Sequence, residues 1–224
     1  MFMNRYRNWF APVLTSEGKR QDGQTEANQI NNLKDFNIKL GNNPEGKYFN
    51  VVGGYTQSQG TSGLAAMNEV LGDMSPSELE ALKDTLRVGA HQDVQVTSSN
   101  WGRNPVLSTE HLITQVFGSA CSIAYDRNPT SSWAEVAKII LDASYEATFH
   151  IALQAADRHQ GAEGSRKLFL TAVGGGVFGN DMSWIADSID KACVKFKDCN
   201  LDVRMVQYSQ PVANSLQTLI SKHQ

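Results

Sequence analysis

The sequence predicts an α/β protein, built as a three-layer α/β/α domain with a mixed central sheet. In the second half of the chain, apolar runs of strand length alternate with amphipathic runs of helix length. Helices that connect successive strands imply parallel pairing and a sheet covered on both faces. The length of 224 residues suits one such domain, and a hydrophobic content of 41% suffices for a core.

Residues 15–35 are polar and rich in Gln, Asn, Gly and Lys, which predicts a loop or an N-terminal arm. We therefore expect an arm or extension over residues 1–35 and a single domain over residues 36–224. Alternating or continuous apolar runs then predict strands over residues 36–40, 48–52, 93–97, 111–117, 168–173 and 201–208. The run 111–117 is apolar enough to predict a buried strand.

Helix-start signals separate these strands. Ser75 and Glu78 have the spacing of a capping box, in which each side chain accepts the backbone N–H of the other residue. This box predicts a helix to about residue 86. Ser132 and Glu135 repeat the spacing and predict a long amphipathic helix to about residue 158. Further helices are expected over residues 64–71, 183–196 and 211–220.

Composition argues against several classes of function. A net charge of -3 and a pI of about 5.9 do not suit a nucleic-acid-binding surface, which is normally basic. No apolar run reaches membrane-spanning length, and the N-terminus lacks the pattern of a secretory signal. Cys121, Cys193 and Cys199 have no C-x-x-C spacing, which predicts free thiols in a reducing compartment. We therefore expect a cytoplasmic protein without a nucleic-acid or membrane partner.

The five histidines show no metal-ligand spacing with carboxylates or cysteines. We therefore expect no metal site and no resident cofactor.

The most informative stretch reads Leu-Phe-Leu-Thr-Ala-Val-Gly-Gly-Gly-Val-Phe-Gly-Asn-Asp over residues 168–181. A strand that leads into glycines and then into a helix lets backbone N–H groups approach an anion closely. This pattern predicts a phosphate-binding loop, with Phe178 placed to lie against a sugar or base. The alternative is a tight strand–helix turn with Phe178 in the core. The candidate ligand-binding residues are Gly174, Gly175, Gly176, Val177, Phe178, Gly179 and Asn180.

A second glycine-rich and hydroxyl-rich stretch follows the predicted strand 48–52. Its hydroxyl groups would bond the hydroxyls of a ribose, and Tyr55 would stack on a ring. The alternative is a surface loop. The candidate ligand-binding residues here are Gly53, Gly54, Tyr55, Gly60, Thr61, Ser62 and Gly63. Gly118, at the end of the predicted strand 111–117, joins them.

The stretch 168–180, the helix after it and the strand 201–208 resemble the C-terminal half of a macrodomain, a family that binds ADP-ribose. The resemblance extends over residues 48–208 in the order of the elements and is most specific over 168–181. It is closest to a divergent branch that includes hydrolases releasing ADP-ribose from modified proteins. It implies that residues 175–179 wrap the diphosphate and the proximal ribose, and that Asn50, at the family's Asn-containing strand end, is a further ligand-binding residue. The implied partner is ADP-ribose or an ADP-ribosylated protein.

The chain departs from the hydrolytic members of this family in the first loop. Many of them carry Asn-Ala-Ala-Asn followed by Gly-Gly-Gly-Val-Asp, whereas this chain reads Asn50-Val-Val-Gly-Gly-Tyr55 and then Gly60-Thr-Ser-Gly63. The loop aspartate is missing. The expected hydrolysis of an ADP-ribosyl linkage then depends on Asp181, which would orient or deprotonate a water beside the distal ribose.

Three alternatives stay open at this stage. Asp181 can be a helix cap, since acidic residues are favoured at helix starts. The protein can be a non-catalytic reader of ADP-ribosylated partners, which the missing aspartate favours. It can also be a doubly wound enzyme that uses another nucleotide.

Overall fold

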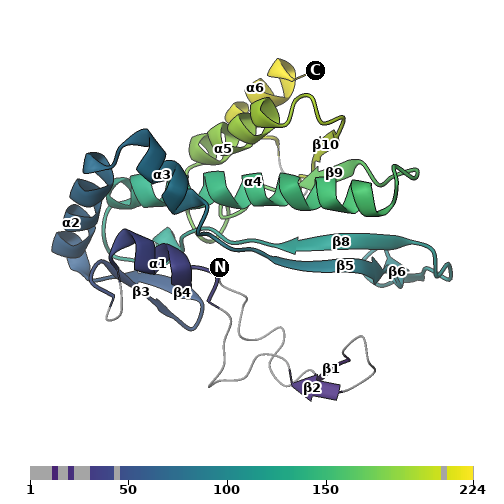
Figure 1. Cartoon of the computed structure of the whole chain (residues 1–224), viewed down its shortest axis with the longest axis horizontal. Coiled ribbons are helices and arrows are strands. Elements are labelled where there is room, and N and C mark those ends of the chain that lie inside the picture. The colour runs from purple at the N-terminus through teal and green to yellow at the C-terminus, as the bar shows by residue number, and fades with distance from the viewer. Residues whose placement is uncertain (1–11, 15–19, 23–30, 43–45, 208–210, 224) are drawn as a thin grey trace.

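The computed structural model describes residues 31–42, 46–207 and 211–223, and the backbone of residues 12–14 and 20–22. The chain has mixed α/β structure, as predicted. A long helix, α4 (Ala134–Arg158), crosses the middle of the molecule (Figure 1). Helices α5 (Met182–Lys195) and α6 (Asn214–Lys222) lie on one side of it, and the strands β5 (Gly89–Gln95) and β8 (Leu112–Phe117) lie on the other.

The described strands pair in twos and do not join into one larger sheet, so the predicted mixed central sheet is not found among the described residues. Four pairs are antiparallel: β1 (Pro12–Leu14) with β2 (Arg20–Asp22), β3 (Phe49–Val52) with β4 (Tyr55–Ser58), β5 with β8, and β6 (Ser98–Ser99) with β7 (Asn104–Pro105). The fifth pair, β9 (Lys167–Leu170) with β10 (Asp202–Met205), is parallel. Helix α5 connects these two strands, so the strand–helix–strand unit predicted around the glycine-rich stretch is confirmed.

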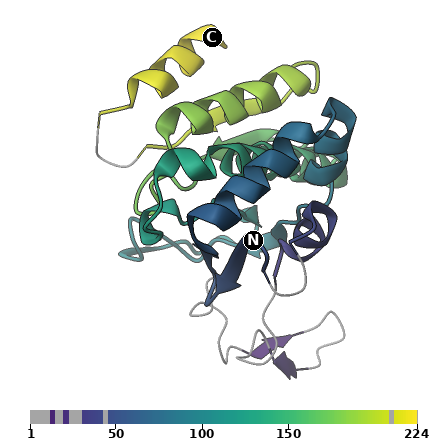
Figure 2. The ribbon, with the colours of Figure 1, turned by 90° about the vertical axis from the view of Figure 1, so that its left-hand side faces the viewer.

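Two apolar clusters form the core. The first gathers buried side chains of α1 (Lys34–Leu40), α2 (Gly60–Asp73) and α3 (Pro76–Lys83) around the fully buried Trp133. The second lies between α4, α5, α6 and β9 and includes the stacked rings of Phe149 and Phe196. Figure 2 shows the helices α4, α5 and α6 stacked above one another. The half-buried Trp184 of α5 packs against both clusters.

The predicted strand at residues 36–40 is wrong, because these residues form most of helix α1. The three apolar residues Phe36, Ile38 and Leu40 alternate, which fits a strand, but Phe36 and Leu40 also stand one helical turn apart. Both are buried beside Leu33, whereas Ile38 is 51% exposed. Packing against the first cluster therefore selects the helix. Gly41 ends it with a left-handed φ of 78°.

Residues 53–63 are not the loop that the sequence predicts. Gly53 and Gly54 form the turn between β3 and β4, and α2 already begins at Gly60. Both turn glycines have positive φ, 58° and 89°, which suits a tight hairpin. The stretch is therefore more ordered than its composition indicates.

The capping box at Ser75 and Glu78 is confirmed, whereas the box predicted at Ser132 and Glu135 is absent. A 3-10 turn (Thr130–Trp133) leads directly into α4, and its last residue, Trp133, takes the N-cap position without a side-chain hydrogen bond. The backbone oxygen of Ser132 accepts instead from the Asn68 side chain of α2, at 3.0 Å. Burial of the Trp133 ring thus sets the start of this helix.

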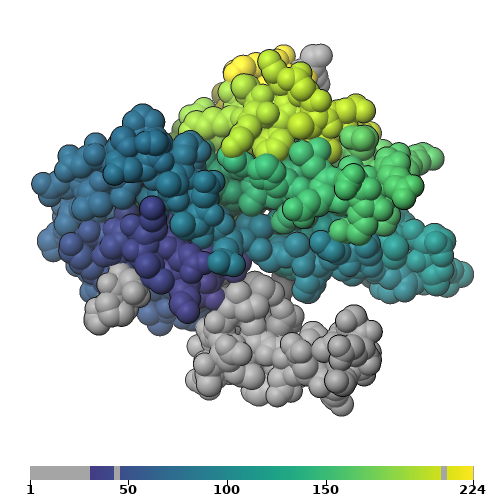
Figure 3. Space-filling view, viewed as in Figure 1, coloured from purple at the N-terminus to yellow at the C-terminus, as the bar shows by residue number. Residues whose placement is uncertain are grey.

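The strand predicted at 111–117 exists as β8, but it is not buried. Leu112 and Ile113 are each 41% exposed, because the strand belongs to a two-stranded sheet that packs on α4. We call residues 89–117 the β-arm, and they form the right-hand end of the molecule in Figure 3. A bulge in β5 places Asp93 at a φ of 55°, where its carboxylate lies 2.7 Å from Nε2 of His159, just after α4. The hydrogen bond with His159 lowers the pKa of Asp93.

None of the helices in the described ranges combines the length and the apolar character needed to span a membrane.

Candidate functional site

The glycine loop, residues 174–179, connects β9 to α5 and is tightly folded. The backbone N–H of Asn180 donates to the Gly174 oxygen, and that of Gly179 donates to the Gly176 oxygen, both at 3.0 Å. Gly174 and Gly179 have left-handed φ values of 82° and 72°. A Cβ on Gly174 would lie only 2.3 Å from the Ala120 Cβ. Backbone geometry and close packing therefore account for part of the glycine content.

The tip of the loop has the properties of an anion-binding surface. Gly176 has no atom within 4 Å of an added Cβ, and Val177 is 74% exposed. The backbone N–H groups of Gly176, Val177 and Phe178 donate to no residue that the structure describes. Neighbouring backbone donors left unpaired just before a helix start can bind an anion. Packing does not explain the glycine at 176.

A partly buried segment ties the glycine loop to the rest of the molecule. We call residues 118–126, which follow β8, the connecting segment. Its Ala124 N–H donates to the Phe178 oxygen at 3.0 Å, and its Cys121 oxygen accepts from Asn180 Nδ2 at 2.7 Å. On its other side the connecting segment is bonded to strand β4. The two glycine-rich stretches of the sequence are thus held against one shared segment.

Three aromatic rings meet where these segments converge. Tyr55 follows the β3–β4 turn, Phe178 belongs to the glycine loop, and Tyr125 lies in a 3-10 turn (Ile123–Tyr125) of the connecting segment. Their ring centroids are 5.0 Å (Tyr55–Tyr125), 5.9 Å (Tyr55–Phe178) and 6.0 Å (Tyr125–Phe178) apart. Tyr125 is 53% exposed. The cluster therefore offers aromatic surface to a ring-bearing ligand beside the loop tip.

Tyr125 was missed in the sequence reasoning. The sequence marks only Gly118 after the predicted strand 111–117, and no local pattern indicates the tyrosine seven residues later. Its place beside Tyr55 and Phe178 comes from tertiary contacts alone. These contacts bring together Tyr55 and Phe178, which are 123 positions apart in the sequence.

Other candidate residues lie in structural positions. The Asn50 side chain sits against Gly46, because its Oδ1 is 1.6 Å from where a Gly46 Cβ would be. A Gly63 Cβ would lie 3.1 Å from the Tyr48 oxygen, so this glycine permits α2 to pack on the backbone. The Thr61 hydroxyl donates to Asn128 at 2.8 Å. Gly60, Ser62 and Gly118 are exposed, with no contact to the glycine loop recorded among the described residues.

Asp181 caps helix α5, as the capping alternative predicts. Its Oδ1 accepts from the backbone N–H and from the hydroxyl of Ser183, both at 2.7 Å. These hydrogen bonds lower the pKa of Asp181, so its carboxylate is ionised at neutral pH. Its Oδ2 accepts no hydrogen bond from the described residues. Asn180 beside it is buried, so its amide serves the connecting segment more directly than a ligand.

Asp126 is a second carboxylate near the site, at the end of the connecting segment. It accepts from the backbone N–H groups of Ser58 and Asn128 and from the Asn128 amide. Partial burial raises the pKa of Asp126, but the hydrogen bonds from Ser58 and Asn128 outweigh burial and lower the pKa to about 2. This carboxylate joins the connecting segment to β4 through its bond with Ser58.

The pKa of Asp126 predicts an acid-dependent loss of stability. A carboxyl with a depressed folded-state pKa stabilises the fold above its ordinary pKa of 3.8 and loses this contribution as the pH falls to about 2. We expect Asp126→Asn to be less stable than the wild type at neutral pH, with the difference shrinking between about pH 4 and pH 2. Urea denaturation across this range measures it. A difference independent of pH would contradict the assignment.

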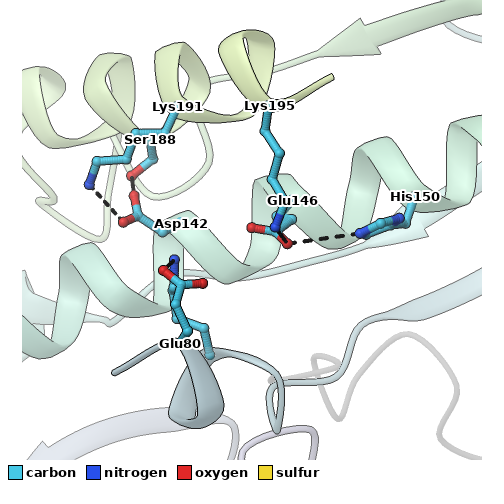
Figure 4. A network of polar contacts seen from close by, with 8 residues as sticks. Glu80, Asp142, Glu146, His150, Ser188, Lys191 and Lys195 are labelled. Carbon is cyan, nitrogen blue, oxygen red and sulfur yellow. Dashed lines mark hydrogen bonds and ion pairs between the residues drawn. The ribbon is translucent and has the colours of Figure 1, made fainter. Parts of the chain in front are cut away.

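A surface groove of about 320 Å³ between helices α3, α4 and α5 is a further candidate that sequence reasoning missed (Figure 4). It is lined by Glu80, Lys83, Asp142, Glu146, Ser188, Lys191, Ala192 and Lys195.

The charged groups of this groove already have partners. Asp142 accepts from the Ser188 hydroxyl at 2.6 Å and from Lys191 Nζ at 2.7 Å, and Glu146 pairs with Lys195. The three acidic and three basic side chains in its lining balance one another. The ion pairs that line this groove therefore join α4 to α5, and the groove offers no activated side chain for catalysis.

The glycine loop and its aromatic neighbours are thus the stronger candidate site. Within the described part of the chain, no three His, Cys, Asp or Glu side chains are grouped so that they could hold a metal ion.

No family model matches this chain, and no curated protein or solved structure matches it either.

Proposed function

We propose that this chain binds ADP-ribose through the glycine loop and the aromatic cluster, as a divergent macrodomain-like protein. The observation that carries the proposal is the loop tip: three consecutive backbone N–H groups without a described partner, at Gly176, Val177 and Phe178, just before α5. A diphosphate matches such a row of donors, because its oxygens accept several hydrogen bonds at once.

The aromatic cluster supports a ligand that carries both phosphate and rings. Phe178 belongs to the loop tip and also contacts Tyr55 and Tyr125. A ligand anchored by its diphosphate at residues 176–178 would therefore have its ribose or base within reach of exposed aromatic surface. Free phosphate or pyrophosphate would contact only the loop tip and not the aromatic cluster.

Isothermal titration calorimetry with ADP-ribose, ADP and NAD tests the proposal. We expect ADP-ribose to bind most tightly, because only it presents the diphosphate between two riboses without a nicotinamide. NAD binding as tightly as ADP-ribose, or no binding of any of the three, would overturn the proposal. The first outcome would favour a nucleotide enzyme of another kind.

Hydrolysis of an ADP-ribosyl linkage is the second candidate function, and Asp181 is the observation that favours it. The carboxylate is exposed and ionised, and Oδ2 is available to orient a water. Its lowered pKa means that activity resting on this carboxylate is constant at neutral pH and declines only in acid, as Asp181 is protonated. The engagement of Oδ1 in capping favours the rival, a non-catalytic reader.

Asp181→Asn separates these two functions. Asparagine caps helices about as well as aspartate, so the fold and ADP-ribose binding should be retained while the carboxylate is lost. We expect the variant to release no free ADP-ribose from an ADP-ribosylated protein. Asp181→Ala serves as the matched control for loss of the cap, at about 1 kcal/mol of stability. Full turnover by Asp181→Asn would remove Asp181 from catalysis, and a wild type that binds without turnover would be a reader.

A further inference from the structure

Strand β4 and the connecting segment are joined by a reciprocal pair of buried residues, Thr56 and Ser122. The Thr56 N–H donates to Ser122 Oγ at 2.8 Å, and the Ser122 N–H donates to Thr56 Oγ1 at 2.9 Å. The two hydroxyls are 2.9 Å apart, and Ser122 Oγ also lies 3.2 Å from the Thr56 oxygen. Their exposed fractions are 0% and 1%.

Both residues of this pair lie next to segments that carry an aromatic ring of the candidate site. Thr56 directly follows Tyr55, and Ser122 directly precedes the 3-10 turn that carries Tyr125. Fixing Thr56 against Ser122 therefore fixes the two tyrosine rings, whose centroids are 5.0 Å apart. Buried hydrogen bonds of this kind are short, directional and costly to break, so they specify one relative placement of two backbones.

The same segment transmits this placement to the glycine loop. Two residues after Ser122, the Ala124 N–H donates to the Phe178 oxygen, and one residue before it, the Cys121 oxygen accepts from Asn180. A shift of Ser122 would therefore move backbone atoms that hold Phe178 and Asn180, on the C-terminal side of the glycine loop. The N–H groups at residues 176–178 would be displaced with them.

We infer that Thr56 and Ser122 are positioning residues of the ligand site: without contacting the ligand, they align the aromatic cluster with the glycine loop. The inference rests on the proposed function for its effect on ligand affinity. The alignment itself, however, is a property of the ligand-free protein and can be measured there.

Thr56→Val is the first test, because it removes Oγ1 with little change in shape. We expect the affinity for ADP-ribose to fall at least roughly tenfold, since a site whose support is loosened loses its preorganised geometry. Thr56→Ser keeps the hydroxyl and should retain most of the affinity. Ser122→Ala removes the partner oxygen and should repeat the effect of Thr56→Val from the connecting segment.

Thr148→Val is the matched control. Its hydroxyl donates to the Ser144 oxygen within α4 at 2.7 Å, away from the connecting segment. We expect this variant to lose stability without losing affinity. Equal affinity losses in Thr148→Val and Thr56→Val, or unchanged affinity in folded Thr56→Val, would overturn the inference.

A measurement without ligand keeps the inference separate from the proposed function. Nuclear Overhauser effects between the ring protons of Tyr55 and Tyr125 should be present in the wild type and in Thr56→Ser, and weakened in Thr56→Val. If they persist unchanged in Thr56→Val, the positioning role is wrong, whatever the protein binds. If they weaken as expected but the wild type does not bind ADP-ribose, the proposed function fails and the alignment stands.

Discussion

Gly176→Glu is expected to abolish ADP-ribose binding while the protein stays folded. A side chain at this position meets no atom within 4 Å, so the loop can accept it. The added carboxylate would lie among the unpaired N–H groups of residues 176–178, where it would take the place of the diphosphate and repel it. We expect the affinity to fall by roughly 100-fold or more, with little change in melting temperature.

Gly72→Glu is the control for this substitution. Gly72 lies near the end of α2, is exposed, and also has no atom within 4 Å of an added Cβ, so the same charge is added away from the site. Calorimetry should show normal affinity for ADP-ribose in this variant. Unchanged affinity in a folded Gly176→Glu protein would mean that the glycine loop does not hold the ligand.

Gly174→Ala is expected to cause the largest loss of stability among single-residue changes in the loop. The new Cβ would lie 2.3 Å from the Ala120 Cβ and 2.7 Å from Asn180 Nδ2, at a φ of 82°. Left-handed backbone costs an L-residue about 1–2 kcal/mol, and overpacking adds about 1–3 kcal/mol. Together we expect the free energy of unfolding to fall by about 2–5 kcal/mol, measured by urea denaturation.

Gly60→Ala isolates the backbone part of this loss, so that the packing part is the difference between the two variants. Gly60 has nearly the same φ, 80°, but no atom lies within 4 Å of its added Cβ. We therefore expect only the backbone part, about 1–2 kcal/mol, in this variant. Equal losses for Gly174→Ala and Gly60→Ala would show that the loop shifts away from Ala120 to make room for the new Cβ. Packing would then not require a glycine at position 174.

Local signals predicted much of the secondary structure. Ser75 and Glu78 form their capping box because the interaction needs only neighbouring residues, and Asp181 caps α5 for the same reason. The unit β9–α5–β10 follows from its apolar runs. The strand prediction for residues 36–40 is wrong because three alternating apolar residues fit both a strand and a helix. The packing of Phe36 and Leu40 selects the helix.

The candidate site was predictable only in part. The glycine pattern identified the loop, and the structure leaves the donors at Gly176 and Val177 without described partners. Which glycines serve packing could not be read from the sequence, because Ala120 and Ala124 approach Gly174 and Gly179 from a distant segment. The roles of Tyr125 and of the Thr56–Ser122 pair could not be predicted for the same reason, since the contacting residues are about 70 positions apart in the sequence.

The connecting segment has a consequence for the motions of the protein. Its hydrogen bonds run to β4 through Ser122 and to the glycine loop through Cys121 and Ala124. Neither neighbour can detach without breaking bonds to this shared segment, so we expect the two to open as one cooperative unit of local unfolding. A ligand that bridges them would then slow amide exchange in both stretches together, by raising a single opening free energy.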